Sequence, residues 1–376
     1  MLQQISGFVL TPQGFVRGEL RHSKGRIVAV EGVAVSEEQA RCGPLVLPGF
    51  IDLHVHGGAG RDVMQGGDAV AAIAQAHARH GTTSLLATTM TAPTSDITDA
   101  LQALAPFVQT RPQGAARVLG VHLEGPYINP GKLGAQPAFA CTATLADVLA
   151  LHKLAPLKLI TVAPEMPGHL ALIVQLRAHG FVVQIGHSNG SYDDGVAALA
   201  AGATGFTHLF NAMSGLHQRE PGLVGAALAH AQRAELIADL QHVHPGAIRA
   251  ALRAIPDLYC VTDSTAATGM PDGQYTLGRH SVTKCLGAVR LADGTLAGST
   301  LTMDQALRNL VGLGCTVTDA SRRTSTIAAE HLGLADRGRL VPGAWADVVV
   351  LNSDLRLQQV WVEGEVVALA QEGQGA

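Results

Sequence analysis

Two histidines separated by a single residue mark the part of the sequence where chemistry is most readily expected. The segment GFIDLHVHG, residues 49–57, alternates apolar and polar residues with the period of a β-strand. This alternation places His54 and His56 on one side of the strand, next to its glycine-rich end. Two imidazoles on one side can bind a single metal ion, although two solvated histidines at a strand end would give the same pattern.

Further candidate ligands stand at the ends of other apolar runs. Glu124, His187, His208 and Asp263 each end a different run that has the character of a strand. Together with the histidine pair they offer four imidazoles and two carboxylates, which suit zinc or another borderline divalent ion. Because the chain has 17 histidines, most of the others are expected to be surface or helix-packing residues.

Eight short apolar runs can bring these side chains together. They lie near residues 49–56, 82–89, 117–123, 157–163, 181–186, 203–209, 235–240 and 258–263. A stretch with helical spacing follows most of them, and this repeated alternation predicts an α/β protein with a (β/α)8 TIM-like barrel. In such a barrel the carboxyl ends of all strands meet at one mouth, so the candidate ligands are expected to converge there.

Short strand-like runs at both ends of the chain predict a second, smaller unit. Each end alone would leave an apolar face exposed, so we expect the two ends to pack together as a small β-sandwich. The predicted domains are therefore residues 1–46 plus 340–376 for the sandwich and residues 47–339 for the metal-dependent barrel. The glycine-rich segment 266–298 is expected to form hairpins and loops.

The bulk composition is that of a soluble globular protein, with 47% hydrophobic and 15% charged residues. A net charge of −4 without a basic cluster argues against a nucleic-acid partner. No apolar run is long enough for a membrane span, and no signal peptide is expected. The five scattered cysteines form no disulfide or zinc pattern, which favours a cytoplasmic protein.

Longer motifs resemble one enzyme family. The stretch LPGFIDLHVHG resembles the strand-1 signature of the amidohydrolase superfamily, and PGAWADVVVLN resembles its C-terminal signature. A series of further motifs resembles, in the same order, those of the N-acetylglucosamine-6-phosphate deacetylases of that superfamily: HLEGPYINPGKLGA, TVAPE, IGHS, THLFNAMSGLHQREPGLVGA, IADLQHV, VTDST and GSTLTMDQALRNLV. Because these motifs span nearly the whole chain in one order, chance is a poor explanation for them.

The resemblance implies two metal positions. Glu124, His187 and His208 form the common site, and His54 with His56 forms a second, more variable one. We therefore expect one or two divalent ions per subunit, most simply zinc, with iron or another divalent ion as alternatives. The fourth strand ends in VAPE, without the metal-bridging lysine of dihydroorotase-like enzymes, and this favours the deacetylase branch.

The implied reaction is hydrolysis of the acetamide of N-acetyl-D-glucosamine 6-phosphate to D-glucosamine 6-phosphate and acetate, in amino-sugar catabolism or cell-wall recycling. A metal ion would lower the pKa of its bound water to about 7. Asp263 is placed to accept the proton from that water and to return it to the leaving amine.

The resemblance also implies a set of substrate contacts. Arg219, His242, Asn211 and Ala212 are expected to hold the sugar phosphate, with Arg219 supplied by the neighbouring subunit of a homodimer. Gln136 stands where the family usually has a histidine that polarises the carbonyl group. A glutamine can donate a hydrogen bond to the oxyanion but cannot carry a proton, so this exchange could slow the reaction or shift the substrate.

Other functions are compatible with the same residues. The galactosamine isomer of the substrate would differ only in contacts to its 4-hydroxyl group, and another phosphorylated or cyclic amide would need the same chemistry. A barrel without catalysis, serving for binding or assembly, would be expected to lose its ligands or its general base. This chain keeps all five candidate ligands and Asp263, which favours an enzyme.

Overall fold

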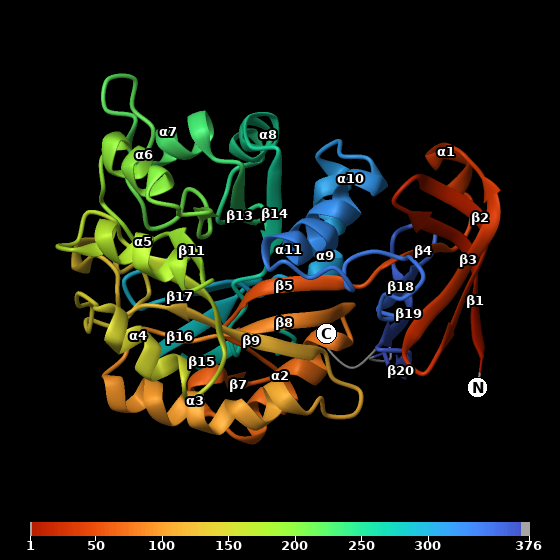
Figure 1. Cartoon of the computed structure of the whole chain (residues 1–376), viewed down its shortest axis with the longest axis horizontal. Helices are drawn as coiled ribbons and strands as arrows, with labels where there is room; N and C mark the ends of the chain where they lie inside the picture. Colours follow the sequence, from red (N-terminus) through yellow and green to blue (C-terminus); the bar gives the residue numbers. More distant parts are fainter. Residues whose placement is uncertain (1, 370–376) are drawn as a thin grey trace.

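The computed structural model of the chain describes residues 2–369 and shows a barrel beside a sheet made by the two chain ends (Figure 1). The red N-terminal strands and the blue C-terminal strands lie side by side at the right of that view. Met1 and residues 370–376, the last part of the predicted sandwich, lie outside the described residues. The division of the chain into domains at residues 46 and 340 stays a prediction.

All eight predicted apolar runs form the strands of the barrel. These are β5 (Phe50–Val55), β8 (Thr82–Thr88), β9 (Arg117–Glu124), β10 (Leu157–Val162), β11 (Val182–Ile185), β12 (Gly205–Phe206), β13 (Arg233–Ile237) and β14 (Asp257–Val261). Strands β5, β8, β9, β10, β11 and β12 pair in parallel as one sheet, and β13 pairs in parallel with β14.

Backbone contacts beyond the strands close the ring. The N–H of Leu209, just after β12, donates to the carbonyl of Glu235 in β13 at 2.9 Å. On the other side, a parallel bridge joins Ser264, after β14, to Val55 at the end of β5. The predicted (β/α)8 barrel is therefore confirmed.

Helices follow most barrel strands. They are α2 (Asp68–Ala78), α3 (Thr94–Gln109), α4 (Leu145–His152), α5 (His169–Ala178), α6 (Tyr192–Ala200), α7 (Gly222–His230), α8 (Pro245–Ala254) and α9 (Met303–Gly312). Local chemistry sets several of their starts. Ser191, four residues after His187, caps α6, since its side chain accepts from the N–H of Asp194 while the Asp194 carboxylate accepts from the N–H of Ser191.

After α9, a helical stretch leads back to the terminal sheet. It consists of α10 (Val317–Ser321), a π-helical turn η3 (Arg322–Thr326) and α11 (Ile327–His331). Short 3₁₀ turns, η1 (Val63–Gln65) and η2 (Pro130–Lys132), and a small hairpin, β6 (Gly57–Gly58) with β7 (Arg61–Asp62), lie in the loops of the barrel. Among residues 2–369 there is no helix both long and apolar enough to cross a membrane.

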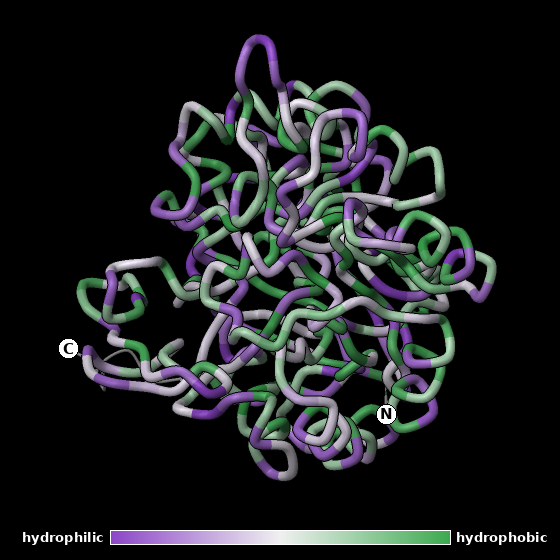
Figure 2. The backbone as a smooth tube through the Cα atoms, turned by 90° about the vertical axis from the view of Figure 1, so that its left-hand side faces the viewer, coloured by the Kyte–Doolittle hydropathy of each residue, from purple (hydrophilic) through white to green (hydrophobic). Residues whose placement is uncertain are grey.

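The barrel strands are buried on both faces. Every residue of β5 and β8 is buried, which explains why their sequences read as nearly continuous apolar runs. In Figure 2 hydrophobic stretches run through the middle of the molecule, and several outer turns, such as the loop at the top of the view, are hydrophilic. The alternation in β5 therefore distinguishes residues that face the barrel interior from residues that face the helix layer. The polar residues Asp52 and His54 are fully buried.

The chain ends form one seven-stranded sheet in the order β20-β19-β18-β4-β1-β2-β3. Its strands are β1 (Gln3–Thr11), β2 (Gly14–Ser23), β3 (Arg26–Ala34), β4 (Leu45–Pro48), β18 (Val348–Leu351), β19 (Leu357–Val362) and β20 (Glu365–Val367), with a short α1 (Glu37–Ala40) before β4. Strand β4 joins the ends, because it pairs with β1 on one side and with β18 on the other. The two ends meet as predicted, and their strands form one continuous sheet.

A network of ion pairs ties this sheet to the barrel. Glu363, after β19, accepts two hydrogen bonds from Arg117 in β9, at 2.8 and 2.7 Å. Arg337 pairs with both Glu363 and the buried Asp347. Burial alone would raise the pKa of Glu363, but its arginine partners outweigh that effect and lower the pKa to about 2.

The segment 266–298 forms hairpins, as predicted. Its strands are β15 (Gly273–Leu277), β16 (His280–Cys285) and β17 (Ala288–Arg290). The buried carboxylate of Asp62 accepts from the N–H of Gly278 at 2.7 Å and so holds the first hairpin turn against the barrel. This contact brings Leu277 to the wall of the cavity at the barrel mouth.

Candidate active site and metal centre

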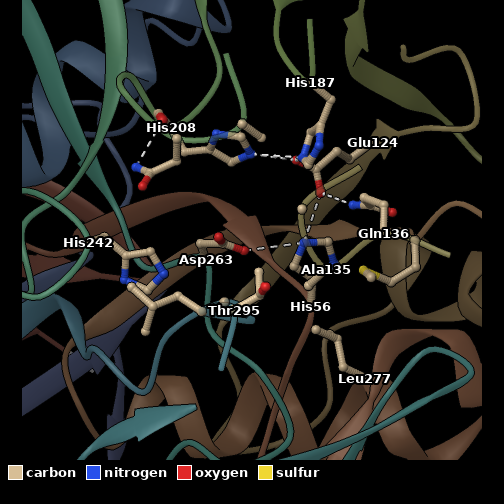
Figure 3. Close-up of a pocket in the computed structure, with 16 residues that line it drawn as sticks. His56, Glu124, Ala135, Gln136, His187, His208, His242, Asp263, Leu277 and Thr295 are labelled. Carbon is tan, nitrogen blue, oxygen red and sulfur yellow. Dashed lines mark hydrogen bonds and ion pairs between the residues drawn. The ribbon is translucent and has the colours of Figure 1, made fainter. Parts of the chain in front are cut away.

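A cavity of about 210 Å³ lies at the carboxyl ends of the barrel strands (Figure 3). It is lined by His56, Met90, Glu124, Gly134, Ala135, Gln136, His187, His208, Asn211, Ala212, His242, Asp263, Leu277, Thr295, Leu296 and Gly298. Nine of the eleven predicted site residues lie in this wall. The two exceptions are treated below with the substrate contacts.

One group of candidate ligands gathers around the first oxygen of Glu124, which ends β9. Its Oε1 lies 3.2 Å from Nε2 of His187 and 3.0 Å from Nε2 of His208. The two imidazole nitrogens are 3.1 Å apart. Three donor atoms that face one another at these distances can close around one cation.

A second group gathers on the other side of the same carboxylate. Nε2 of His54 and Nε2 of His56 are 3.1 Å apart, and they lie 3.5 and 3.3 Å from Oδ1 of Asp263. Oε2 of Glu124 is 3.0 Å from His56 Nε2 and 3.3 Å from His54 Nε2. Each oxygen of Glu124 therefore faces a different group of donor atoms.

The buried negative charges of the site favour a bound cation. Glu124, Asp263 and Glu235 are buried at or just beneath the cavity, and within residues 2–369 no lysine or arginine lines it. Buried carboxylates need a paired charge, because desolvation of an isolated one costs several kcal/mol. The donor atoms are nitrogen and carboxylate oxygen, which are the ligands of zinc and similar divalent ions. The residues present therefore fit a metal ion in either group.

The pKa values of His54 and His56 show the same preference for positive charge. Burial by itself would lower the pKa of both histidines of β5. The negative charges of Glu124 and Asp263 instead raise the pKa of His54 well above its usual range, and hydrogen bonds to the same carboxylates raise that of His56 to about 9. The buried carboxylates thus favour positive charge at both imidazoles, which is the charge that a bound metal ion would supply.

Three of the side chains in the cavity wall belong to residues with strained backbone conformations. His187, His208 and Asp263 have φ values of 46°, 29° and 49°, a region that non-glycine residues rarely adopt. Each of them directly follows or lies just beyond a barrel strand. Such strain persists only where neighbouring contacts hold it; the N–H of Asp263, for example, donates to the carbonyl of His54 at 2.9 Å.

Gln136 is fixed at both ends of its amide. Its Oε1 accepts from the backbone N–H of Thr91 at 2.7 Å, so its Nε2 must face Glu124, to whose Oε2 it donates at 2.7 Å. The amide carries a second N–H, and Gln136 lines the cavity. The residue can therefore orient Glu124 and still donate one hydrogen bond to a ligand.

The predicted phosphate contacts divide into two sets. Asn211, Ala212 and His242 line the cavity. His242 Nδ1 lies 2.7 Å from Oδ2 of Asp239, and although burial opposes it, this carboxylate raises the pKa of His242. The histidine can therefore present a positive charge to a phosphate.

Arg219 does not reach the cavity of its own chain. It lies in the loop 215–220, whose residues are all exposed, and which projects between α6 and α7 at the top of Figure 1. The prediction that Arg219 binds substrate therefore depends on a neighbouring subunit. His54 is the other predicted residue outside the cavity wall, because its ring lies directly behind that of His56.

The structure adds residues that the sequence did not single out. Glu235 of β13 lies 3.0 Å from Nδ1 of His54, Thr91 holds Gln136, and Lys132 accepts from Nδ1 of His187 through its carbonyl at 2.9 Å. Leu277 and Thr295 reach the cavity from the hairpin segment. Of these, only Glu235 had a signal in the sequence, as a charged residue inside an apolar strand.

Comparisons with known proteins agree with this geometry. Residues 45–367 match the Amidohydrolase family. The N-acetylgalactosamine-6-phosphate deacetylase of Escherichia coli O157:H7 is 42% identical to this chain over 371 residues, which cover 96% of this chain and 97% of that protein. The N-acetylglucosamine-6-phosphate deacetylase of Vibrio furnissii is 41% identical over 335 residues, covering 86% of this chain and 84% of that protein.

A solved structure is similar over almost its whole length. It is a variant of the N-acetyl-D-glucosamine-6-phosphate deacetylase of Mycobacterium smegmatis in complex with N-acetyl-D-glucosamine-6-phosphate. It superposes with a TM-score of 0.89 at 35% identity, over 98% of this chain and 99% of that chain. The barrel and the terminal sheet are therefore both shared with that protein.

Proposed function

The chain belongs to the amidohydrolase family, and on that premise we propose that it is a metal-dependent deacetylase of amino-sugar phosphates. Its substrate is N-acetyl-D-glucosamine 6-phosphate, which it hydrolyses to D-glucosamine 6-phosphate and acetate. The observation that carries this proposal is the position of Glu124, whose two oxygens face two groups of imidazole and carboxylate donors in one cavity.

Two metal positions are proposed from that arrangement. Glu124, His187 and His208 would hold one divalent ion, and His54, His56 and Asp263 would offer a second position; a different oxygen of Glu124 faces each group. An ion bound there supplies a Lewis acid, which lowers the pKa of a coordinated water to about 7 and polarises an amide carbonyl. Zinc is the first candidate because imidazole and carboxylate are its usual ligands, and iron is the second.

Asp263 is the proposed general base and acid. Its side chain is 12% exposed and lines the cavity, so it can reach both a water molecule and a bound substrate. It takes a proton from the attacking water and returns it to the nitrogen of the leaving amine, which is a poor leaving group without that proton. The free N–H of Gln136 donates to the carbonyl oxygen, where negative charge develops.

We assign recognition of the substrate phosphate to three residues of the cavity wall and to Arg219. His242, with its raised pKa, and Asn211 with the backbone at Ala212 face the substrate within one chain. Arg219 completes the phosphate site from a second subunit, where its guanidinium can form paired hydrogen bonds with phosphate oxygens. This arrangement requires a homodimer, which we propose as the active form.

A second substrate is favoured by one observation. The N-acetylgalactosamine-6-phosphate deacetylase of Escherichia coli O157:H7 is 42% identical to this chain, and the two proteins cover almost all of each other. The galactosamine isomer is therefore the alternative substrate for the same chemistry. For the cellular location we propose the cytoplasm, since the described cysteines Cys42, Cys141, Cys260, Cys285 and Cys315 are all free thiols.

The substrate assignment is tested by acetate release from four compounds. N-Acetylglucosamine 6-phosphate, N-acetylgalactosamine 6-phosphate and the two unphosphorylated sugars are compared at equal concentrations, with Asp263→Asn as the inactive control. We expect the highest kcat/KM for the glucosamine phosphate and little turnover of either free sugar. A higher kcat/KM for the galactosamine phosphate would select the alternative, and equal turnover of the free sugars would contradict a phosphate site.

A further inference from the structure

Glu235 is a fully buried carboxylate directly beneath the cluster of candidate metal ligands. It lies in β13, between Ala234 and Leu236, which are also buried. A charged side chain in this position is costly unless its oxygens are bonded. Both oxygens are bonded, and the partners connect Glu235 to the two metal positions.

The first partner is the ring of His54. Oε2 of Glu235 lies 3.0 Å from Nδ1 of His54, while Nε2 of the same ring faces His56 and Glu124. An imidazole that donates through Nδ1 to a carboxylate keeps its Nε2 lone pair free for a metal ion. Glu235 therefore fixes both the tautomer and the orientation that His54 needs as a ligand.

The second partner is the backbone of His208. Its N–H donates to the same Oε2 at 3.2 Å, and this residue has the strained φ of 29°. The bond holds the backbone from which the His208 ring reaches Glu124 Oε1. One carboxylate oxygen thus contacts one ligand from each group.

A buried hydroxyl holds Glu235 itself in place. The hydroxyl of Tyr259 donates to Oε1 of Glu235 at 3.3 Å and accepts from the Gln184 side chain at 2.6 Å. Both side chains are fully buried, so Glu235 has no room to turn away from His54.

The other imidazoles of the site are oriented differently. In the part of the chain that the structure describes, Nδ1 of His56 and Nδ1 of His208 are buried without a hydrogen-bond partner, and Nδ1 of His187 faces a backbone carbonyl. His54 is therefore the one candidate ligand among residues 2–369 whose outer nitrogen faces a carboxylate. A change at Glu235 should act mainly on the group that contains His54.

We propose that Glu235 is a positioning residue that sets the affinity of the second metal position, formed by His54, His56 and Asp263. This inference rests on the proposed two-metal site. Without the carboxylate, the His54 ring can turn or take the other tautomer, and the second ion is lost while the first, at Glu124, His187 and His208, stays bound. Partners of this kind typically change metal affinity 10- to 100-fold.

The test compares three variants. Glu235→Leu removes both hydrogen bonds of Oε2, whereas Glu235→Gln keeps an amide oxygen that can accept from His54 and His208. Tyr259→Phe is the matched control, because it removes a hydroxyl from the same buried network and leaves the contacts of Oε2 intact. Metal per subunit is measured at buffered free Zn²⁺, and cobalt-substituted protein reports each position through its absorption spectrum.

We expect two ions per subunit in the wild type and in Tyr259→Phe, and one in Glu235→Leu. The second ion should bind 10- to 100-fold more weakly to Glu235→Leu, with a smaller loss in Glu235→Gln. Excess Zn²⁺ should restore kcat in Glu235→Leu while KM stays within about threefold, a recovery that a purely structural defect would not show. If Glu235→Leu does not fold, the affinity of Glu235→Gln for the second ion tests the inference instead, and an affinity equal to that of the wild type would overturn it.

Two results would overturn the inference: two ions bound to Glu235→Leu with wild-type affinity, or a wild type that binds one ion. Acetate release by the wild type is measured separately and judges the proposed function. A wild type that releases acetate with one ion would overturn this inference alone. A loss of the second ion from Glu235→Leu, in a protein that never releases acetate, would support the inference and contradict the function.

Discussion

Replacement of Gln136 by leucine should slow the chemical step without removing the metal. The side chain is buried, and its amide is held between the Thr91 N–H and Glu124 Oε2, each at 2.7 Å. Its remaining N–H is the donor that we assign to the carbonyl oxygen of the substrate. Loss of one such donor typically lowers kcat 10²- to 10³-fold, which corresponds to about 2.7–4 kcal/mol.

The lost contact to Glu124 adds a smaller effect. A hydrogen bond to a charged group contributes about 1.5–3 kcal/mol, but Glu124 keeps its imidazole neighbours and its metal ions, so metal content should be retained. We therefore expect kcat of Gln136→Leu to fall at least 10²-fold, with KM changed less than about fivefold. Gln136→His restores a donor of the kind usual in the family and should recover most of that loss.

The assay is steady-state acetate release at saturating Zn²⁺, combined with metal analysis of each variant. Thr91→Val is the matched control, because the Thr91 hydroxyl is buried without a partner in the described residues while its backbone N–H still holds Gln136. This control should stay within about twofold of the wild type. A Gln136→Leu enzyme with more than one fifth of wild-type kcat would refute the assignment of the free N–H to the carbonyl oxygen.

Three further predictions concern Glu124, Arg219 and Glu363. Glu124→Gln should lose bound metal from both positions, because the shared carboxylate charge disappears; metal analysis showing two ions in this variant would contradict a shared ligand. Arg219→Ala should raise KM for the phosphorylated sugar about 10- to 100-fold at nearly unchanged kcat, as expected for a charged hydrogen bond to phosphate, whereas Gln218→Ala in the same exposed loop should not. An unchanged KM in Arg219→Ala would remove that residue from the phosphate site. The pKa of Glu363, lowered to about 2, lies below its unfolded value near 4.3, so this group stabilises the fold above about pH 4.5, and that contribution disappears as the pH falls toward 2. Urea unfolding at a series of pH values should show this loss, with a weaker dependence in Arg337→Met, and an equal pH dependence in both proteins would contradict it.

The barrel could be predicted from the sequence because its strands are buried on both faces. Strands of this kind read as apolar runs, and each of the eight runs became a strand within a few residues of its expected bounds. The candidate ligands could be located for a related reason. They stand at the carboxyl ends of those strands, and the barrel topology alone brings such positions to one mouth.

Other features depend on contacts that no local pattern records. Glu235 meets His54 across 181 residues of sequence, and the charge inside an apolar strand did not indicate which partner it would find. Leu277 and Thr295 reach the cavity from the hairpin segment. The sequence of that segment predicts its turns but not the direction in which the hairpins point. The packing of the two chain ends on each other was predicted, but strand patterns do not specify which edges pair, so the role of β4 in joining both ends was not.

The central claim is that two metal positions sharing Glu124 carry out deacetylation of a phosphorylated amino sugar. The most direct test is to strip the protein with a chelator, restore Zn²⁺ stepwise, and record bound metal and acetate release from N-acetylglucosamine 6-phosphate in the same samples. We predict no turnover in the stripped protein, with activity that rises with bound metal and is complete by two ions per subunit. Acetate release that persists in protein free of metal, or none at full metal occupancy, would contradict the claim.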